Sequence, residues 1–463
     1  MSYGSIIAAI STPSGKGGVA IIRISGEGAV GVAEKIFFPK NKKSLREIPA
    51  RLQVYGDVIY DGEYIDDGMA TVFRAPASYT GEDTVEISCH GGVLVTKRVL
   101  EAVLEAGAVP AESGEFTRRA FINGKLSLTD AEAIGNLLEA RTASQAKLYS
   151  RAARGLLSDK IAEIRKGLTE ILSSVFARID YPDEDLGDFS DSEARERLVS
   201  IKSTITALMR TYPTGKAVSE GINAVICGKP NAGKSSLYNA MLGEDAAIVT
   251  DVEGTTRDVL SRVISLGRVM LNLSDTAGIR EDERTDKVEK IGIERSRAAI
   301  ATAELVIAVF DGSLPFDARD EDILEAVKGT EATRIAVINK CDLEQKLDRS
   351  LIDAHFNKTV SVSAKSGAID AVGALTEVIE ELFTDGKLSL GNDAIVSSAR
   401  QNAALARALG FVDAAIAAQD LGVYTDAVSS EVERALGAIA EIDGRAVSES
   451  VVSEIFSKFC VGK

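Results

Sequence analysis

The sequence predicts a multidomain protein in which an α+β domain comes first and an α/β domain is inserted into a discontinuous all-helical domain. Short β-type runs and glycines dominate residues 1–120. Apolar residues at helical spacing mark residues 121–220 and return over residues 386–463. Between them, residues 221–385 alternate buried-strand runs with helical stretches, which is typical of a parallel sheet with crossover helices.

Length and composition indicate a globular protein of several domains. The chain has 463 residues, 45% hydrophobic and 26% charged, which corresponds to about three domains at roughly 150 residues each. No apolar run approaches the roughly 20 residues that span a bilayer, and the amino terminus lacks the basic region of a secretory signal. We therefore expect a cytoplasmic protein with no membrane partner.

The cysteine pattern and the net charge exclude several functions. The cysteines, Cys89, Cys227, Cys341 and Cys460, are far apart and form no CxxC pair, so neither a zinc site nor a disulfide framework is indicated. A formal net charge of -16 argues against general nucleic-acid coating. It leaves open a local basic patch for RNA or, equally, a solvated helix face, from these residues: Arg118, Arg119, Arg151, Arg154, Lys160, Arg165 and Lys166.

In the first domain, strands are predicted at "VAIIRIS", "LQVYGDVIY", "GMATVFRA" and "DTVEISC", and helices at "GAVGVAEKIF" and "VLVTKRVLEAVLEAG". "CHGG" (Cys89–Gly92) is interpreted as a glycine turn before a helix, with His90 in a structural role. "SGKGG" (Ser14–Gly18) precedes a strand and lacks a following Gly-Lys-Ser, so it predicts a turn or a ligand-facing loop.

Three apolar seams predict the helices of the helical domain. An acidic, proline-containing loop, "DYPDEDLGDFSD", interrupts the first part, and the last seam runs into the terminal "FCVGK". The seams are Leu157, Ile161, Ile164, Leu168, Ile171, Val175 and Ile179; Val428, Val432, Leu436, Ile439 and Ile442; and Val451, Val452, Ile455, Phe456 and Phe459.

A phosphate-binding loop is predicted at "GKPNAGKS" (Gly228–Ser235). It follows the strand "INAVIC" and precedes the helix-like "SLYNAML", which is the context that the G-x-x-x-x-G-K-[ST] motif requires. The glycines let backbone N–H groups cradle phosphate at a helix N-terminus. Lys234 is expected to reach the β- and γ-phosphates, and Ser235 to bind Mg²⁺.

Four further motifs predict a GTPase of the small G-protein (Ras-like) fold. "GTTRD" (Gly254–Asp258) stands where the first switch loop belongs, and "DTAG" (Asp275–Gly278) follows the strand "VMLNLS". "NKCD" (Asn339–Asp342) ends the strand "RIAVI", and its Asp342 can accept hydrogen bonds from two guanine N–H donors that adenine lacks. "SAK" (Ser363–Lys365) is expected to close over the base.

Three glutamates are candidates for the residue that orients the water for GTP hydrolysis. Ile279 follows "DTAG", where Ras-type GTPases carry a water-orienting glutamine. An isoleucine cannot orient water, so another carboxylate must act. Glu281, Glu283 and Glu289 are the nearby candidates, and the residues alone do not choose among them.

These motifs together resemble the MnmE (TrmE) family of tRNA-modification GTPases over nearly the whole chain. The resemblance is carried by "PSGKGGVAIIRISG", "YTGEDTVEISCHGG", "GEFTRRAFINGKLSLTDAEAI", the set "GKPNAGKSSLYNAM", "VTDVEGTTRDV", "DTAG" and "IGIERS", and "FCVGK". It implies a homodimer joined through the N-terminal domain, with G domains that pair when K⁺ and GTP are bound.

The resemblance also implies a reaction. With the FAD-containing partner GidA (MnmG), in a heterotetramer or larger complex, such proteins add an aminomethyl or carboxymethylaminomethyl group to C5 of the wobble uridine (U34) of certain tRNAs. The carbon would come from 5-formyltetrahydrofolate or methylene-tetrahydrofolate held by the N-terminal domain. The resemblance implies folate contacts from Arg23, Glu82, Lys125 and Lys463, and a role for Cys460 in the modification centre.

In the nucleotide site the resemblance implies K⁺ ligands at Asn231, Thr250, Val252 and Thr255, and Mg²⁺ ligands at Ser235 and Thr256. Glu289 would be the catalytic glutamate. The stretch from "DTAG" to "VEKIGIER" is about two residues longer than the expected pattern, so Glu283 stays as the fallback. The expected GTP-binding residues are Asn231, Ala232, Gly233, Lys234, Ser235, Ser236, Thr250, Asp251, Val252, Glu253, Gly254, Thr255, Thr256, Asp275, Thr276, Ala277, Gly278, Asn339, Lys340, Asp342, Ser363, Ala364 and Lys365.

A second hypothesis is a non-enzymatic GTP switch in ribosome assembly, as in Era-type proteins that share this G domain. Such a switch needs only a G domain and a small RNA-binding module. The long N-terminal α+β segment, the split helical domain and the terminal "FCVGK" favour the modifying enzyme.

Overall fold

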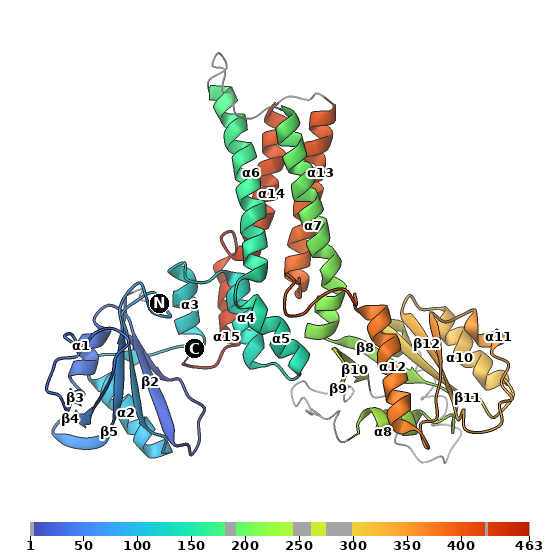
Figure 1. The fold of residues 1–463 in the computed structure, drawn as a ribbon, viewed down its shortest axis with the longest axis horizontal. Helices are drawn as coiled ribbons and strands as arrows, with labels where there is room; N and C mark the ends of the chain where they lie inside the picture. The colour runs from blue at the N-terminus through green and yellow to red at the C-terminus, as the bar shows by residue number, and fades with distance from the viewer. Residues whose placement is uncertain (1–3, 181–190, 244–260, 275–298, 422–424, 463) are drawn as a thin grey trace. The chain divides into compact units, whose positions relative to one another are not determined.

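The computed structural model describes residues 4–180, 191–243, 261–274, 299–421 and 425–462 (Figure 1). The chain divides into two compact units. One comprises Met1–Glu139, Ala152–Ser190 and Ala417–Lys463, and the other comprises Ala140–Arg151 and Asp191–Ile416. Within the described residues, no helix is long and apolar enough to cross a membrane.

The first unit is built on a sheet with the strand order β3-β4-β5-β6-β2-β1-β7. Neighbouring strands are antiparallel except for β7, which pairs parallel to β1. The strands are β1 (Ile7–Ile10), β2 (Val19–Ser25), β3 (Phe37–Pro39), β4 (Gln53–Tyr60), β5 (Glu63–Phe73), β6 (Thr84–His90) and β7 (Val109–Pro110).

Two helices, α1 (Ala29–Glu34) and α2 (Val93–Glu105), cover one face of this sheet. Alternate residues of the strands point toward them, so Ile22 and Ile24 of β2 are fully buried while the intervening Arg23 points to the other face. The alternation therefore places Arg23 on the face opposite the main core, where Ile7, Ala9 and Phe116 form a second, smaller buried cluster.

The rest of the first unit is helical. Helix α6 lies beside α14 (Figure 1), and the predicted seam of α6 is buried from Leu157 to Val175, which confirms that prediction. Val452, Phe456 and Phe459 of the last seam are buried against Leu128 and Ala131. The helices are α3 (Glu115–Ile122), α4 (Leu128–Leu138), α6 (Leu156–Asp180), α14 (Thr425–Asp443) and α15 (Glu449–Ser457).

The second unit contains a sheet with the strand order β13-β12-β11-β8-β10-β9. The strands pair in parallel except for β9, which is antiparallel to β10 at the sheet edge. The prediction of a parallel sheet is therefore wrong for this edge strand. The strands are β8 (Ile222–Cys227), β9 (Ser261–Leu266), β10 (Val269–Ser274), β11 (Leu305–Asp311), β12 (Thr333–Asn339) and β13 (Lys358–Ser361).

Apolar clusters lie on both faces of this sheet, as a doubly covered α/β sheet requires. Helices α8 and α12 pack on one face, and α10 and α11 on the other. The helices of the second unit are α5 (Ala143–Ala152), α7 (Asp191–Ser219), α8 (Lys234–Met241), α10 (Ala318–Lys328), α11 (Ser350–Asp353), α12 (Ala368–Phe383) and most of α13 (Ala399–Asp420).

The helices expected in one helical domain are thus shared between the two units, with α6 and α14 in the first and α7 in the second. The predicted limits at residues 120, 220 and 385 stay predictions. Most of the acidic loop "DYPDEDLGDFSD", like Ile179 of the first seam, lies outside the residues whose side chains are described.

Candidate functional site

The loop between β8 and α8 has the tight backbone that a phosphate cradle requires. Gly233 adopts a φ of 103°, and a β-carbon there would lie only 1.9 Å from Asn339 Nδ2. Glycine is therefore the residue that lets the loop approach the end of β12. Next to it, Ser235 and Ser236 begin α8 with exposed side chains, so their hydroxyls are accessible to a ligand.

Lys234 folds back over this loop. Its Nζ donates hydrogen bonds to the carbonyl oxygens of Gly228 at 2.8 Å and Lys229 at 3.0 Å. Burial lowers the pKa of Lys234, and it raises the pKa of the neighbouring Cys227 thiol to about 12. A phosphate group at the loop would supply the negative charge that the buried ammonium lacks here.

The loop is anchored from behind by a buried ion pair. Lys229 Nζ lies 2.6 Å from Asp320 Oδ2 and 3.0 Å from Asp317 Oδ2. The side chains of Lys229 and Asp320 are only 6% and 1% exposed. Burial acts to lower the pKa of Lys229, but the hydrogen bonds to Asp320 and Asp317 raise it overall. The two aspartates also cap α10, so the loop is fixed to the start of that helix.

Asn339 joins the three described motifs of the nucleotide site. Its Nδ2 donates to the Ala232 carbonyl at 2.9 Å, and its Oδ1 accepts from the Ala364 N–H at 3.0 Å. Because Asn339 is buried, this pair of bonds holds the phosphate-binding loop, "NKCD" and "SAK" together.

The residues predicted to contact the base follow β12 and β13, at the same end of the sheet as the P-loop. Asp342 is exposed, and a hydrogen bond from the Ser363 hydroxyl lowers the pKa of its carboxyl, so it is an ionised acceptor at neutral pH. Lys340 Nζ pairs with Asp311 Oδ2 at 2.5 Å, and the side chain of Lys365 is exposed.

Many of the expected nucleotide-site residues fall outside the part of the chain that the structure describes. Those that lie outside the described residues are Thr250, Asp251, Val252, Glu253, Gly254, Thr255, Thr256, Asp275, Thr276, Ala277, Gly278, Ile279, Glu281, Glu283 and Glu289. Their assigned roles stay predictions.

A second group of predicted residues lies in the first unit, beginning with Arg23 on the sheet face opposite the core under α1 and α2. Arg23 of β2 pairs with Glu86 at 2.8 Å, and its guanidinium lies 5.5 Å from the ring of Tyr79 and 5.6 Å from that of Phe116. Two rings and a carboxylate therefore fix the direction of this cation.

The carboxyl-terminal tail docks at the same place. The Gly462 carbonyl accepts hydrogen bonds from Ser11 Oγ at 3.0 Å and from Arg23 NH1 at 3.5 Å. Val461 forms an isolated bridge with Ser113, while the side chain of Cys460 is exposed. The tail thus presents the Cys460 thiol to solvent. Lys463 lies outside the described residues.

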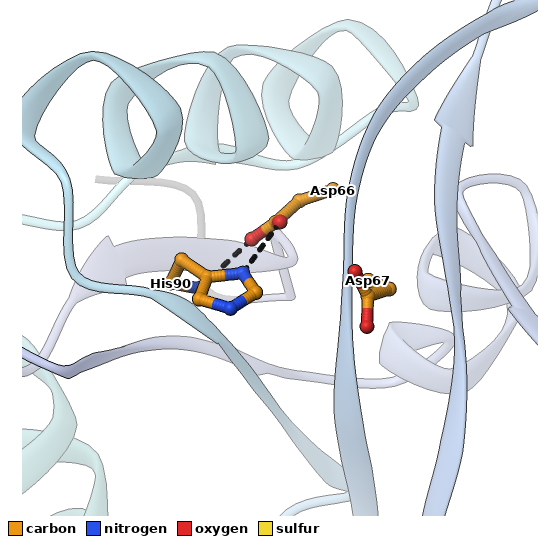
Figure 2. A group of neighbouring side chains, drawn as sticks. All are labelled: Asp66, Asp67 and His90. Carbon is orange, nitrogen blue, oxygen red and sulfur yellow. Dashed lines mark hydrogen bonds and ion pairs between the residues drawn. The ribbon is translucent and has the colours of Figure 1, made fainter.

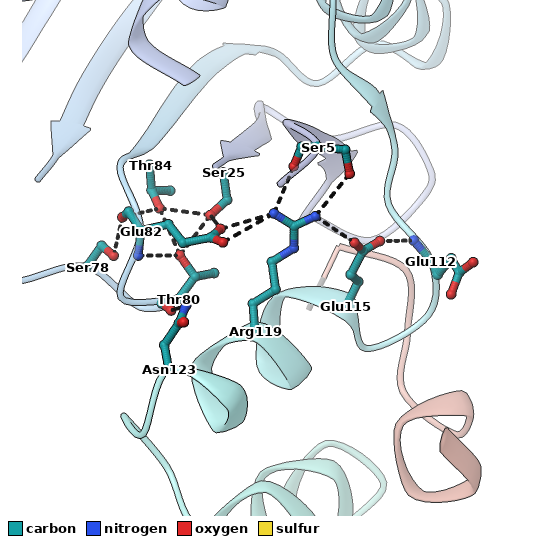
Figure 3. Close-up of polar contacts among 10 residues, drawn as sticks. All are labelled: Ser5, Ser25, Ser78, Thr80, Glu82, Thr84, Glu112, Glu115, Arg119 and Asn123. Carbon is teal, nitrogen blue, oxygen red and sulfur yellow. Dashed lines mark hydrogen bonds and ion pairs between the residues drawn. The ribbon is translucent and has the colours of Figure 1, made fainter. Parts of the chain in front are cut away.

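Glu82 belongs to a polar network beside these residues (Figure 3). Its Oε2 accepts from Ser25 Oγ at 2.9 Å and from Arg119 at 3.2 Å. Arg119 also pairs with Glu115 at 2.8 Å and donates to the Ser5 carbonyl at 2.9 Å.

Lys125 Nζ is held by the Pro76 carbonyl at 3.0 Å, near the loop that carries Glu82. From the sequence alone, Arg119 is predicted only as part of a basic patch or of a solvated helix face. Its i,i+4 spacing from Glu115 was the available signal for a fixed guanidinium.

One further cluster, Asp66, Asp67 and His90, has the composition of a metal site (Figure 2). Asp66 accepts from both the backbone N–H and the ring Nδ1 of His90, each at 2.8 Å. Asp67 accepts from Tyr55 at 2.6 Å and Tyr64 at 3.0 Å, and the latter bond raises the pKa of Tyr64 to about 12. Every carboxylate oxygen already has a protein donor, which supports the expected structural role of His90.

The loop at the end of β8, fixed by Asn339 to the two base-side motifs, defines a P-loop GTPase domain. Residues 6–125 match the family model of the GTP-binding protein TrmE N-terminus, and residues 128–460 match the MnmE helical domain. The chain belongs to the tRNA modification GTPase MnmE family. It is accordingly a GTP-hydrolysing enzyme of tRNA modification.

Named relatives match along the whole chain. The tRNA modification GTPase MnmE of Ligilactobacillus salivarius is 40% identical over 464 residues, covering 99% of this chain and 98% of that protein. The protein of the same name from Listeria innocua is 40% identical over 458 residues, with 99% of each chain covered. That from Clostridioides difficile is 37% identical over 457 residues, again with 99% of each covered.

Proposed function

We propose that the chain works with an FAD-containing GidA (MnmG) partner to add an aminomethyl or carboxymethylaminomethyl group to C5 of the wobble uridine (U34) of certain tRNAs. GTP hydrolysis in the inserted domain would drive this reaction in the cytoplasm, and the chain would act as a homodimer. One observation supports the modification centre above all others, namely the docking of the Cys460–Gly462 tail beside Arg23.

In the nucleotide site, Lys234 would exchange its two carbonyl partners for the β- and γ-phosphates. Ser235, with Thr256, would bind Mg²⁺, which offsets phosphate charge. Asn231, with Thr250, Val252 and Thr255, would hold K⁺ beside the same phosphates. Asp342 would accept two N–H bonds from guanine, and its lowered pKa keeps it in the accepting form.

The water that attacks the γ-phosphate needs an orienting group, since Ile279 cannot supply one. We assign this role to Glu289, with Glu283 as the alternative. A K⁺ ion in the site would stabilise developing negative charge, as an arginine does in other GTPases. Replacing K⁺ with Na⁺ should therefore depress hydrolysis and G-domain pairing, and indifference to the cation would remove the K⁺ assignment.

In the N-terminal domain, the polar contacts of Arg23 and Glu82 suit a tetrahydrofolate donor of the 5-formyl or methylene type. The carboxylate of Glu82 is oriented by Ser25 and Arg119 and its side chain is 26% exposed, so pterin N–H donors can reach it. Arg23, Lys125 and Lys463 would provide cations for the glutamate tail of the folate. Cys460 would lie near the bound folate in the modification centre, with Lys463 at the edge of the ligand.

The proposal can be tested by deleting the gene and analysing tRNA nucleosides by mass spectrometry. We expect wobble uridine to be unmodified in the deletion strain and restored by the full chain. Normal tRNA modification together with defective ribosomes would instead support the GTP switch in ribosome assembly. Addition of labelled formyl- or methylene-tetrahydrofolate to the purified system would show whether its carbon enters the tRNA.

A further inference from the structure

The turn between β9 and β10 is clamped onto the end of α12. The backbone N–H of Arg268 donates to Glu380 Oε1 at 2.6 Å, and Arg268 Nε donates to Glu380 Oε2 at 3.1 Å. The same guanidinium donates to Thr384 Oγ1 at 3.1 Å. One carboxylate thus binds both the backbone and the side chain of a single turn residue, which fixes the turn more firmly than a surface ion pair does.

The preceding residue makes this contact sterically tight. Gly267 has a φ of 56°, and a β-carbon there would lie 2.1 Å from Glu380 Oε1. A larger residue here would displace the Glu380 carboxylate and would have to adopt a φ that L residues rarely adopt, so glycine favours the close approach. The turn therefore fits α12 in shape as well as through the ion pair of Arg268 with Glu380.

The clamp lies at the end of the sheet away from the P-loop. Leu271 of β10 pairs with Ile222, near the start of β8, whereas the P-loop follows Cys227 at its other end. Strands β9 and β10 form a hairpin whose open ends are Ser261 and Ser274. In the chain, Ser261 follows the segment that carries "GTTRD", and Ser274 is followed by "DTAG". The hairpin thus connects the predicted first switch loop, "GTTRD", and the "DTAG" motif to α12.

From α12 the hydrogen bonds continue to α7, the long helix that leads into β8. The hydroxyl of Thr384 donates to the Glu380 carbonyl at 2.7 Å, and the following N–H, of Asp385, donates to Thr214 Oγ1 at 2.8 Å. Thr214 is buried in α7, and one turn earlier Thr211 accepts from the Val396 N–H at 2.9 Å.

The hairpin contacts the end of α7 by a second route. Asn272 of β10 donates from Nδ2 to the Glu220 carbonyl at 2.9 Å, at the junction of α7 with β8. All these residues belong to the second compact unit. A displacement of the hairpin would therefore change contacts with α7 directly, through side chains as well as through the strand ladder.

We propose that Arg268 and Glu380 are positioning residues that couple the GTPase cycle to tRNA modification by holding the hairpin against α12 and α7. They lie at the end of the sheet opposite the P-loop, so hydrolysis proceeds without them. Their role is to transmit a change in the position of the hairpin to α7. The inference goes beyond the proposed function, because it requires only that the chain hydrolyses GTP and takes part in tRNA modification.

The test is Glu380→Ala in the full chain, with Glu381→Ala as the matched control. Glu381 is the next residue of α12, but it pairs with Lys358 of β13 at 2.7 Å and its side chain is 61% exposed. Phosphate release from the purified variants gives GTP hydrolysis. Modified tRNA nucleosides from a deletion strain expressing each variant give modification, and the thermal midpoint gives stability.

For Glu380→Ala we expect hydrolysis within about threefold of wild type and modification lowered by about tenfold, the middle of the range for coupling between sites. Arg268→Met should give the same split, and Glu381→Ala should change neither activity. Glu380→Gln keeps an acceptor for the Arg268 N–H and should recover part of the modification. If Glu380→Ala does not fold, the ratio of the two activities is read from Glu380→Gln and Arg268→Met.

Several results would overturn the inference. They are equal losses of both activities, a loss of hydrolysis alone, an effect of Glu381→Ala as large as that of Glu380→Ala, or no change in Glu380→Ala. The wild-type chain is the reference for modification. A failure of the proposed wobble-uridine chemistry would therefore appear in the wild type itself, separately from a failure of the clamp.

Discussion

The P-loop domain and the N-terminal domain assemble their candidate sites in different ways. In the P-loop domain, each described motif is a short contiguous run next to the end of a strand, and Asn339 ties these motifs together. In the N-terminal domain, Arg23, Glu82 and Cys460 come from β2, a loop and the end of the chain. Local sequence defines the first site, and tertiary docking defines the second.

This difference predicts different responses to substitution. Where backbone groups and short motifs build a site, a single side chain performs a single task, and its loss leaves the cradle in place. Where distant segments are brought together, the loss of one residue can also release a segment. The following substitutions compare the two regions, starting with the largest expected effect.

Loss of the proposed catalytic glutamate should have the largest effect. Glu289→Ala should lower GTP hydrolysis by about 10²–10⁴-fold, the range for losing a general base, with GTP binding retained. Single-turnover hydrolysis and nucleotide titration measure the two quantities. Glu283→Ala is the matched control, and a larger defect in that variant would move the assignment to Glu283.

Removal of the buried cation behind the P-loop should lower the stability of the fold. Lys229→Met leaves Asp320 buried without its partner, which should lower the free energy of unfolding by about 3–5 kcal/mol. Lys358→Met removes an exposed pair with Glu381 and should cost less than about 1 kcal/mol. Urea unfolding measures both, and equal midpoints for the two variants would show that the buried pair does not anchor the loop.

Asp342→Asn should change base selectivity. An amide offers guanine one acceptor where the carboxylate offers two, so GTP affinity should fall by about 100-fold, the loss of one or more charge-assisted bonds of about 1.5–3 kcal/mol. Xanthosine triphosphate, which carries an oxygen in place of the guanine amine, should be preferred. Asp348→Asn, at a carboxylate that accepts from Ser350, is the control. Unchanged GTP use by Asp342→Asn would exclude this base contact.

The smallest effect concerns pH. The hydrogen bond and charge of Asp66 raise the pKa of His90 above its ordinary value of 6.5. A raised folded-state pKa means that the pair stabilises the fold below pH 6.5 and that this stabilisation is lost as pH rises through the higher folded value. The difference in urea midpoint between wild type and His90→Gln should therefore shrink from pH 6 to pH 8. A difference that does not vary with pH would show that the pair is not ionic.

Sequence patterns predicted the elements that have strong local signals. The runs of β2, β8, β11 and β12 are apolar and β-branched, and all form strands. β1, with the sequence "IAAI", and the edge strand β9, with "SRVISL", were not predicted, because alanine and serine are weak strand formers and pairing partners complete these strands.

The site residues likewise divide into those with a local sequence signal and those that depend on contacts between distant parts of the chain. "GKPNAGKS" is readable because the chemistry of phosphate binding fixes both spacing and context. Arg119 beside Glu82, and the tail beside Arg23, depend on contacts between residues far apart in the chain, which no local pattern contains. The clamp of Arg268 on Glu380 belongs to this second kind as well.

The central claim is that one chain carries a GTPase site and a separate modification site that includes the docked tail. Cys460→Ser tests it most directly, with Lys458→Ala, an exposed residue two positions earlier in the chain, as the control. Phosphate release and mass spectrometry of wobble uridine should be measured on the same preparations. We expect Cys460→Ser to hydrolyse GTP at the wild-type rate and to leave wobble uridine unmodified, while Lys458→Ala retains both activities. Normal modification by Cys460→Ser would contradict the claim.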